Sequence, residues 1–376
     1  MRIPNWPVWG EREVELLREV LESGQWGGFN PIVKRLERDF AAFQHCAHGV
    51  SLANGTVAIE VALEALGIGP GDEVIVPAIS FISTATAVSR AGATPVFVDI
   101  ERSTFNMDPE RAAAAVSPKT KALMAVHFGG QLADMDRLMA LAAERGLILM
   151  EDAAHAHGSE WRGRRAGSLG LLGTFSFQNS KVMTAGEGGM LTTNDAEVAA
   201  RVRSLADQGR RPGEGWFFHF SLGTNYRLTA WQAAVLVAQL ERLPEQIRLR
   251  QRNAELLLAE LAEVEGLRFQ AAPPEANAHS WYLLLGRIDA AQFGATRDEF
   301  HQALTARGVP CTPFYPHPLY ANPLYRAGGC RVQPCPVSEA CIGDAFWLPQ
   351  RALMGDEATT REIAVAIRSA ARPQMR

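Results

Sequence analysis

A single lysine, Lys181, stands between a strand-like segment and a cluster of glycines in the stretch from Thr174 to Gly189. A primary amine held beside a tight turn suits a lysine that forms a Schiff base with a carbonyl compound. The glycines allow the chain to turn sharply there, or to approach a ligand without a side chain in the way. Within this window alone, a solvated surface lysine is the more common interpretation. The remaining candidate residues must therefore decide between the two.

Two acids and two histidines gather in the short segment Glu151, Asp152, His155 and His157. His155 and His157 are two residues apart, so a helix would point them to different sides, which argues against a metal site. Asp152 ends a predicted buried strand, where a carboxylate can keep a heterocyclic nitrogen protonated, as the electron sink of pyridoxal phosphate requires. A helix N-cap is the alternative interpretation of Asp152.

A third candidate is the turn Asn54-Gly55-Thr56, which connects a predicted strand over 48–52 to an apolar helix over 57–66. The start of such a helix presents unpaired backbone N–H groups and the positive end of the helix dipole. Both features suit a phosphate group. A simple N-cap role for Asn54 explains the turn equally well.

These candidates follow a regular alternation of predicted strands and helices. The strands cover 73–77, 94–99, 121–127 and 147–152, and the helices between them cover 82–91, 109–116 and 135–145. The strands are continuously apolar, which indicates a parallel or mixed sheet covered on both faces. Ligands of such sheets bind at the carboxyl ends of the strands. We therefore expect 77–81, 127–130 and 152–157 to converge on one crevice.

Further elements flank this alternation. Helices are predicted over 11–22, 32–43, 196–207, 297–307 and 358–371, with strands over 189–194 and 281–287. A long helix is predicted over 230–263, and Pro244 is expected to bend it into a second domain. The predicted division is a large domain over 1–245 and a smaller α/β domain over 246–376.

Composition narrows the class of protein. The chain has 376 residues, 47% of them hydrophobic, and a net charge of −4 from 37 basic and 41 acidic residues. This balance gives no basic surface for nucleic acid or anionic lipid. Five cysteines, three of them at 330, 335 and 341, follow neither a disulfide framework nor a Cys-x-x-Cys metal motif. With no signal-peptide core and no membrane span, we expect a cytoplasmic protein whose partners are small molecules and its own copies.

Five segments together resemble the DegT/DnrJ/EryC1/StrS family of pyridoxal phosphate enzymes, the sugar and cyclitol aminotransferases of fold type I. They are Asn54-Gly-Thr, Gly71-Asp-Glu-Val-Ile-Val-Pro77, Glu151-Asp-Ala-Ala-His155, Ser176-Phe-Gln-Asn-Ser-Lys181 and Gly186-Glu-Gly-Gly189. Each segment is weak evidence by itself, but the ordered set is specific and spans almost the whole chain. The resemblance implies an α/β fold like that of aspartate aminotransferase, with a large mixed-sheet domain and a smaller C-terminal α/β domain.

The resemblance also implies roles for individual residues. Lys181 and Asp152 are the expected catalytic residues, which bind pyridoxal 5'-phosphate covalently and pair with its pyridine nitrogen, respectively. The expected cofactor contacts are Gly55, Thr56, Phe81, Asp152, His155, Ser176, Gln178, Lys181 and Asn225. Among them, Phe81 is expected to stack on the cofactor ring. Asn225 is expected to reach the phosphate from the neighbouring subunit of a homodimer with shared active sites.

The implied reaction is a ping-pong transamination from glutamate or glutamine to a keto-sugar or keto-cyclitol. The sequence around Lys181 is most similar to the branch of the family that includes 3-amino-5-hydroxybenzoate synthases. A dehydratase that forms an aromatic ring is therefore one alternative. A non-catalytic or metal-dependent protein on the same fold is another. Trp26, Tyr315 and His317 are candidate substrate contacts. Tyr315 and His317 lie in a proline-rich loop, where packing roles explain them equally well.

Overall fold

An eight-stranded mixed sheet forms the centre of the computed structural model, which describes residues 1–371. The strand order is β1-β9-β8-β5-β4-β2-β3-β14. The strands are β1 (His48–Leu52), β2 (Glu73–Pro77), β3 (Thr94–Val98), β4 (Thr120–Val126), β5 (Ile148–Asp152), β8 (Leu172–Ser176), β9 (Gly189–Thr193) and β14 (Arg331–Val332). Only β9 runs against its neighbours, β1 and β8. The prediction of a mixed sheet is confirmed.

Both faces of this sheet are buried, as its continuously apolar strands predict. The side chains of β2 show the reason, because Ile75 belongs to one core cluster while Val74 and Val76 belong to the cluster on the opposite face. The covering helices are α1 (Glu11–Ser23), α2 (Pro31–Phe43), α3 (Gly55–Ala65), α4 (Ser83–Arg90), α5 (Pro109–Ala115), α6 (Met135–Arg145), α7 (Ala196–Ala206) and α8 (Ala230–Leu261). The predicted elements agree with these bounds to within two residues.

A second, antiparallel sheet of four strands lies in the C-terminal part, in the order β10-β12-β15-β13. Its strands are β10 (Leu267–Phe269), β12 (Leu283–Ile288), β13 (Thr312–Pro313) and β15 (Ala345–Pro349). The helices of this part are α9 (Ala290–Phe293), α10 (Arg297–Ala306), α11 (Pro323–Arg326), α12 (Pro336–Asp344) and α13 (Glu357–Arg368). Short 3₁₀ segments cover Phe128–Gly130, Leu319–Ala321 and Gln350–Leu353, and a small third sheet joins β11 (Ala276–Ala278), β6 (Glu160–Trp161) and β7 (Arg164–Arg165).

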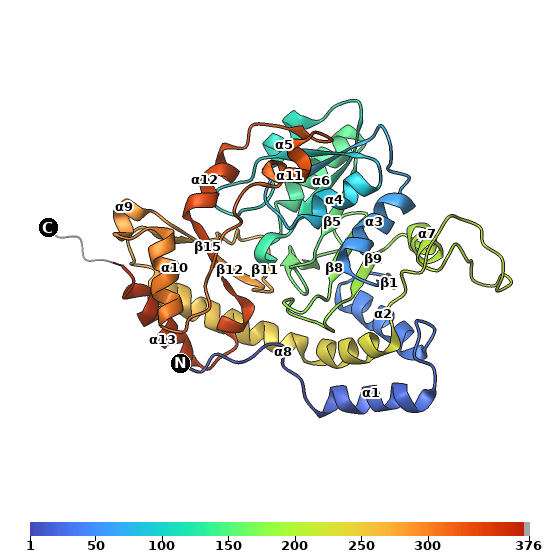
Figure 1. Cartoon of the computed structure of the whole chain (residues 1–376), viewed down its shortest axis with the longest axis horizontal. Helices are drawn as coiled ribbons and strands as arrows, with labels where there is room; N and C mark the ends of the chain where they lie inside the picture. The colour runs from blue at the N-terminus through green and yellow to red at the C-terminus, as the bar shows by residue number, and fades with distance from the viewer. Residues whose placement is uncertain (372–376) are drawn as a thin grey trace.

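Helix α8 connects the two parts and runs as one helix from Ala230 to Leu261, with Pro244 inside it. Figure 1 shows this yellow helix extending from the region of α1 and α2 to α13 at the other end of the molecule. The expected division between 1–245 and 246–376 falls inside α8 and stays a prediction. Among the helices within residues 1–371, none combines the length and the apolar character needed to cross a membrane.

Candidate active site

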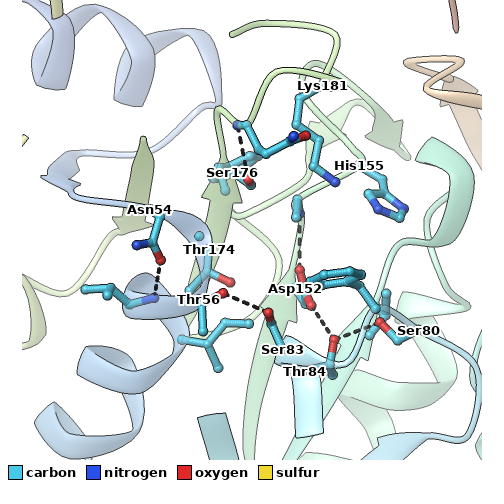
Figure 2. A pocket seen from close by; sticks show the side chains of 18 of the residues that line it. Asn54, Thr56, Ser80, Ser83, Thr84, Asp152, His155, Thr174, Ser176 and Lys181 are labelled. Atoms are coloured by element: carbon cyan, nitrogen blue, oxygen red, sulfur yellow. Dashed lines mark hydrogen bonds between the residues drawn. The ribbon is translucent and has the colours of Figure 1, made fainter. Parts of the chain in front are cut away.

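A cavity of about 750 Å³ opens where β2, β4, β5 and β8 end and where α3 and α4 begin. Its lining includes most of the residues that the sequence singled out, which are Gly55, Thr56, Phe81, Asp152, His155, Ser176, Gln178, Lys181 and Tyr315. Figure 2 shows Lys181, His155 and Asp152 around the same space, with Thr56 and Ser176 on the side of α3. The convergence expected from the strand ends is therefore confirmed for 77–81 and 152–157, whereas the 127–130 segment contacts His155 without lining the cavity.

Lys181 lies in the loop that follows β8, and its side chain lines the cavity. The backbone N–H of Lys181 donates to the carbonyl of Gln178 at 2.9 Å, which closes a tight turn before the lysine. The amine Nζ lies 4.4 Å from the centroid of the Tyr282 ring. The structure favours a functional lysine over an ordinary surface lysine, because the side chain of Lys181 is half-buried and lines the cavity.

The glycines after Lys181 do not line the cavity, and Gly189 instead allows two backbone segments of the site to pack closely. A Cβ atom on Gly189 would lie 2.3 Å from the carbonyl oxygen of Asn54, so a side chain there would push β9 away from the start of α3. Glu187, by contrast, is the residue of this cluster that lines the cavity. At Gly189 the close approach is to the Asn54 turn, and an approach of these glycines to a ligand stays a prediction.

Asp152 ends β5 and is buried, with its carboxylate at the cavity wall. One carboxylate oxygen accepts a hydrogen bond from the Thr84 hydroxyl at 2.7 Å, and the other accepts from the backbone N–H of Ala154 at 3.3 Å. The Thr84 hydroxyl is itself 2.7 Å from that of Ser80. No helix starts after Asp152 in the described chain, so the N-cap interpretation is wrong. Its bonds instead orient a carboxylate toward a ligand.

The start of α3 forms another wall of the cavity. The side-chain oxygen of Asn54 accepts from the N–H of Val57 at 2.9 Å, so Asn54 is the N-cap of this helix. The first-turn N–H groups have no acceptor within the helix and therefore suit an anion. The hydroxyls of Thr56 and Ser83 lie 2.7 Å apart beside them. The N-cap interpretation is confirmed, and the capping fixes a helix N-terminus at the cavity, where the binding of a phosphate stays a prediction.

Gly55 is needed because α3 approaches β8 closely. A Cβ atom at position 55 would lie 2.7 Å from the Cβ atom of Ser176, which is closer than packed atoms come. The substitution Gly55→Ala is therefore expected to push the turn over 54–56 and Ser176 apart. We expect the affinity for pyridoxal phosphate to fall about 10- to 100-fold.

Fluorescence titration of the apoenzyme with pyridoxal phosphate measures this change. Gly343→Ala is the matched control, since an added methyl group at Gly343 has no atom within 4 Å. An unchanged affinity of the Gly55→Ala variant would contradict the assignment of this turn to the phosphate.

His155 and Tyr315 supply polar groups near Lys181. The Nδ1 atom of His155 accepts from the N–H of Gly129 at 3.3 Å, which leaves the proton of the neutral ring on Nε2. Burial, followed by the charge of Lys181, lowers the pKa of His155 well below its ordinary value, so the ring stays neutral. Burial also raises the pKa of Tyr315, with contributions from Tyr282 and Asp152. Both side chains are therefore hydrogen-bond donors at neutral pH.

The other acid and histidine of the 151–157 segment do not line the cavity. Glu151 lies on β5 beside Asp152 and faces the other side of the sheet, because neighbouring residues of a strand face opposite sides. Glu151 is fully buried and accepts from the N–H groups of Gly167, Leu169 and Gly170. His157 lies among Phe40, Phe175 and Phe177, and burial lowers its pKa to about 3. Across residues 1–371, no group of three or more side chains has the composition of a metal site.

Three sequence candidates lie outside the cavity lining. Trp26 is 51% exposed and packs against Trp231, with ring centroids 4.9 Å apart. His317 is hydrogen-bonded through Nδ1 to the carbonyl of Pro318 at 3.1 Å. Asn225 is exposed, and its side-chain oxygen accepts from the N–H of Arg227 at 3.4 Å. Contacts of Trp26 and His317 with a substrate, and of Asn225 with a neighbouring subunit, stay predictions.

Among the polar cavity residues to which sequence reasoning gave no role are four beside Asp152, Thr56 or Lys181, which are Ser80, Ser83, Thr84 and Tyr282. The first three follow β2, and the row of hydroxyls after Pro77 is a signal that the sequence carries. Tyr282 lies about a hundred residues from Lys181 in the chain and has no local signal. The four residues complete a set with an amine, an oriented carboxylate and a helix N-terminus, which fits the aldehyde, the pyridine nitrogen and the phosphate of pyridoxal phosphate, respectively.

Comparisons with known proteins agree with this arrangement. A model of the DegT/DnrJ/EryC1/StrS aminotransferase family matches residues 7–368. The chain is 39% identical to the 3-amino-5-hydroxybenzoate synthase of Amycolatopsis mediterranei (strain S699), over 97% of each chain. It is 40% identical to the L-glutamine:2-deoxy-scyllo-inosose aminotransferase of Streptoalloteichus tenebrarius, over 98% of this chain and 94% of the relative. The crystal structure of a 3-amino-5-hydroxybenzoic acid synthase is similar with a TM-score of 0.92 and 38% identity, over 98% of each chain.

Proposed function

Because the chain belongs to the DegT/DnrJ/EryC1/StrS aminotransferase family, we propose that the cavity is its active site, with Lys181 and Asp152 as the catalytic residues. The enzyme is an aminotransferase with pyridoxal 5'-phosphate as its cofactor. The observation that supports these roles most strongly is that the amine of Lys181 and the carboxylate of Asp152 line the same space as the N-terminus of α3. The alternative of a non-catalytic or metal-dependent protein is not retained.

The cofactor supplies a carbonyl carbon that takes up an amino group and a pyridinium ring that withdraws electrons. Lys181 would hold the cofactor through its amine. When that amine is free, it would accept the proton from the α-carbon of the donor substrate at Nζ and release it again, as a general base and then a general acid. Asp152 stabilises the proton on the pyridine nitrogen with its negative charge.

The other proposed contacts hold and orient the cofactor. The first turn of α3, at Gly55 and Thr56, binds the phosphate together with Ser176 and Gln178. Phe81, which is 58% exposed in the single chain, stacks on the ring. His155 donates a hydrogen bond from Nε2 beside the ring. Tyr315 donates from its hydroxyl to the substrate.

The donor is glutamate or glutamine, and the acceptor is a keto-sugar or keto-cyclitol. A relative that is 40% identical is named for an amino transfer from L-glutamine to 2-deoxy-scyllo-inosose, which supports this choice of substrates. Incubation of the holoenzyme with each donor and a panel of keto-sugars and keto-cyclitols tests it by mass spectrometry. We expect an aminated product, a 2-oxo acid and ping-pong kinetics. The absence of amine transfer to every member of the panel would contradict the proposal.

A second function is favoured by another relative, which is named as a 3-amino-5-hydroxybenzoate synthase. We propose a dehydratase that aromatises an aminocyclohexenone as the alternative. The same incubation separates the two functions, because a dehydratase without aminotransferase activity moves no amino group to a simple keto-cyclitol. When an aminocyclohexenone is supplied in place of the keto-cyclitol, the dehydratase would release water and produce the ultraviolet absorbance of an aromatic product.

We further propose that the enzyme is a homodimer with shared active sites. The loop over 209–223, which follows α7, extends from the body of the molecule in Figure 1. It exposes large apolar side chains, at Trp216, Phe217, Phe218, Phe220 and Leu222. An exposed apolar patch of this kind is typical of a protein interface. A second copy that covers the loop brings Asn225, just beyond it, to the neighbouring phosphate.

The substitution Leu222→Asp tests this dimer. Leu222 is 93% exposed in the single chain, so a charge there costs nothing in the monomer but opposes burial in an interface. We expect the dimer dissociation constant to rise about 10- to 100-fold in analytical ultracentrifugation, with a parallel loss of activity at low protein concentration. Val365→Asp, at another exposed apolar residue, is the matched control. A Leu222→Asp variant that dimerises like the wild type would contradict the assignment of this loop.

The five cysteines are free thiols in the structure. Because thiols stay reduced in the cytoplasm, we propose that compartment as the location of the enzyme.

A further inference from the structure

The ring of Tyr282 lies at the reacting end of Lys181, although none of the roles described above involves this tyrosine. Its centroid is 4.4 Å from the Nζ atom of Lys181 and 4.4 Å from the centroid of His155. Its hydroxyl is 2.8 Å from that of Ser180, the residue before the lysine. Tyr282 thus contacts both the amine and the backbone segment that carries it.

The residue before Tyr282 has an unusual backbone conformation. Trp281 has a φ of 54°, in the left-handed region that bulky residues rarely adopt. Its N–H donates to Nδ1 of His279 at 2.7 Å, and its indole N–H donates to the side-chain oxygen of Gln251. The indole ring stacks on His279 with centroids 4.0 Å apart. These contacts hold a strained turn that redirects the chain so that Tyr282 faces the cavity.

A buried arginine is hydrogen-bonded to the segment over 279–282 that contains Tyr282. Arg250, on α8, is fully buried and donates from Nε to the carbonyl of Ser280 at 2.8 Å. Ser280 donates two further hydrogen bonds, from its N–H to the hydroxyl oxygen of Ser159 at 2.9 Å and from its hydroxyl to the carbonyl of His155. Within residues 1–371, Arg250 makes no ion pair, and its Nη2 atom has no hydrogen-bond partner.

A buried guanidinium without a carboxylate is costly to maintain, and burial lowers the pKa of Arg250 to about 9. Its one strong bond to the backbone is at Ser280, two residues before Tyr282. We therefore infer that the main structural role of Arg250 is to hold the segment over 279–282 in place.

We propose that Tyr282 is a further catalytic residue, whose ring face holds the amine of Lys181 while that amine carries a proton, and that Arg250 is the positioning residue that fixes Tyr282. The amine becomes an ammonium when it takes the proton from the α-carbon, and it becomes neutral again when it delivers the proton. An ammonium is attracted by the face of an aromatic ring. Tyr282 therefore stabilises and orients the proton carrier between the two transfers. This inference rests on the proposed role of Lys181.

The test compares Tyr282→Leu, which removes the ring, with Tyr282→Phe, which keeps the ring and loses only the hydroxyl. The rate of the donor half-reaction is followed in the holoenzyme by cofactor absorbance at increasing glutamate or glutamine concentration. We expect Tyr282→Leu to lower the maximal rate about 5- to 30-fold, with the half-saturating concentration changed less than about 3-fold. Tyr282→Phe is expected to stay within about 3-fold of the wild type. Tyr320→Leu, at a tyrosine outside the cavity lining, is the control.

Arg250→Gln tests the positioning role through a double-mutant cycle. Because Arg250 acts through Tyr282, the double variant is expected to be no slower than Tyr282→Leu alone. If thermal melting shows that Arg250→Gln does not fold, Arg250→Lys takes its place, since lysine keeps the positive charge but lacks the guanidinium that donates to the carbonyl of Ser280. If the rate losses of the Arg250 and Tyr282→Leu variants instead multiply in the double variant, the positioning role of Arg250 would be overturned.

Borohydride reduction of each variant separates a failure of this inference from a failure of the proposed function. Lys181 unlabelled in the wild type would overturn the proposed function. Lys181 labelled in all variants, with Tyr282→Leu as fast as the wild type or Tyr282→Phe as slow as Tyr282→Leu, would overturn only the role of the ring.

Discussion

Replacement of Lys181 by alanine is expected to lower kcat by at least about 10⁴-fold, because it removes both the covalent anchor and the proton carrier. The loop that bears Lys181 is held by its own backbone bonds, such as that from the N–H of Lys181 to Gln178, so the variant should fold normally. The phosphate contacts at the start of α3 remain, and the cofactor should still bind without a covalent link. Steady-state kinetics and cofactor absorbance measure the two effects separately.

Lys121→Ala is the matched control for this substitution, since Lys121 is an exposed lysine near the other end of β4. Small primary amines such as methylamine are expected to restore part of the activity of Lys181→Ala, because they can enter the cavity and carry the proton. A Lys181→Ala variant with more than about 1% of wild-type activity would contradict the role of this lysine.

The substitution Asp152→Asn is expected to lower kcat about 10²- to 10³-fold while the cofactor stays bound. An amide has the same shape as the carboxylate and can still accept the hydrogen bond from Thr84. It carries no negative charge, however, and so it does not favour a proton on the pyridine nitrogen. The loss should therefore appear in kcat, with a melting temperature close to that of the wild type.

Asp195→Asn is the control for Asp152→Asn. Asp195 is the N-cap of α7, and asparagine caps a helix as well as aspartate does. Equal activity of the Asp152→Asn and Asp195→Asn variants would mean that the charge at residue 152 plays no part in the reaction.

Sequence patterns predicted the central sheet well because its strands are strongly apolar and bounded by turn residues. The predicted strands over 48–52 and 73–77 coincide with β1 and β2. The convergence of Phe81 and Asp152 on one cavity was also predictable, since parallel strands place their carboxyl ends at one edge. The 127–130 segment does not line that cavity. By contrast, β6, β7, β13 and β14 are two residues long and give no periodic signal.

The parts of the site that the sequence did not reveal depend on contacts between distant segments. Tyr282 lies beside Lys181 because the chain changes direction just before β12. Trp281 adopts a left-handed backbone conformation there, and the buried Arg250 is hydrogen-bonded to the carbonyl of Ser280. The hydroxyl of Thr84, on α4, donates a hydrogen bond to the carboxylate of Asp152, at the end of β5. The two residues are far apart in the sequence, so no local sequence pattern connects them. The N-cap interpretation of Asp152 failed for a related reason, since it assumed that a helix follows β5.

The central claim is that Lys181 binds the cofactor covalently. Reduction of the purified holoenzyme with sodium borohydride, followed by proteolysis and peptide mass mapping, tests it most directly. We expect one stoichiometric phosphopyridoxyl modification, on the peptide that contains Lys181. Absence of the cofactor, or its attachment to any other lysine, would contradict this assignment.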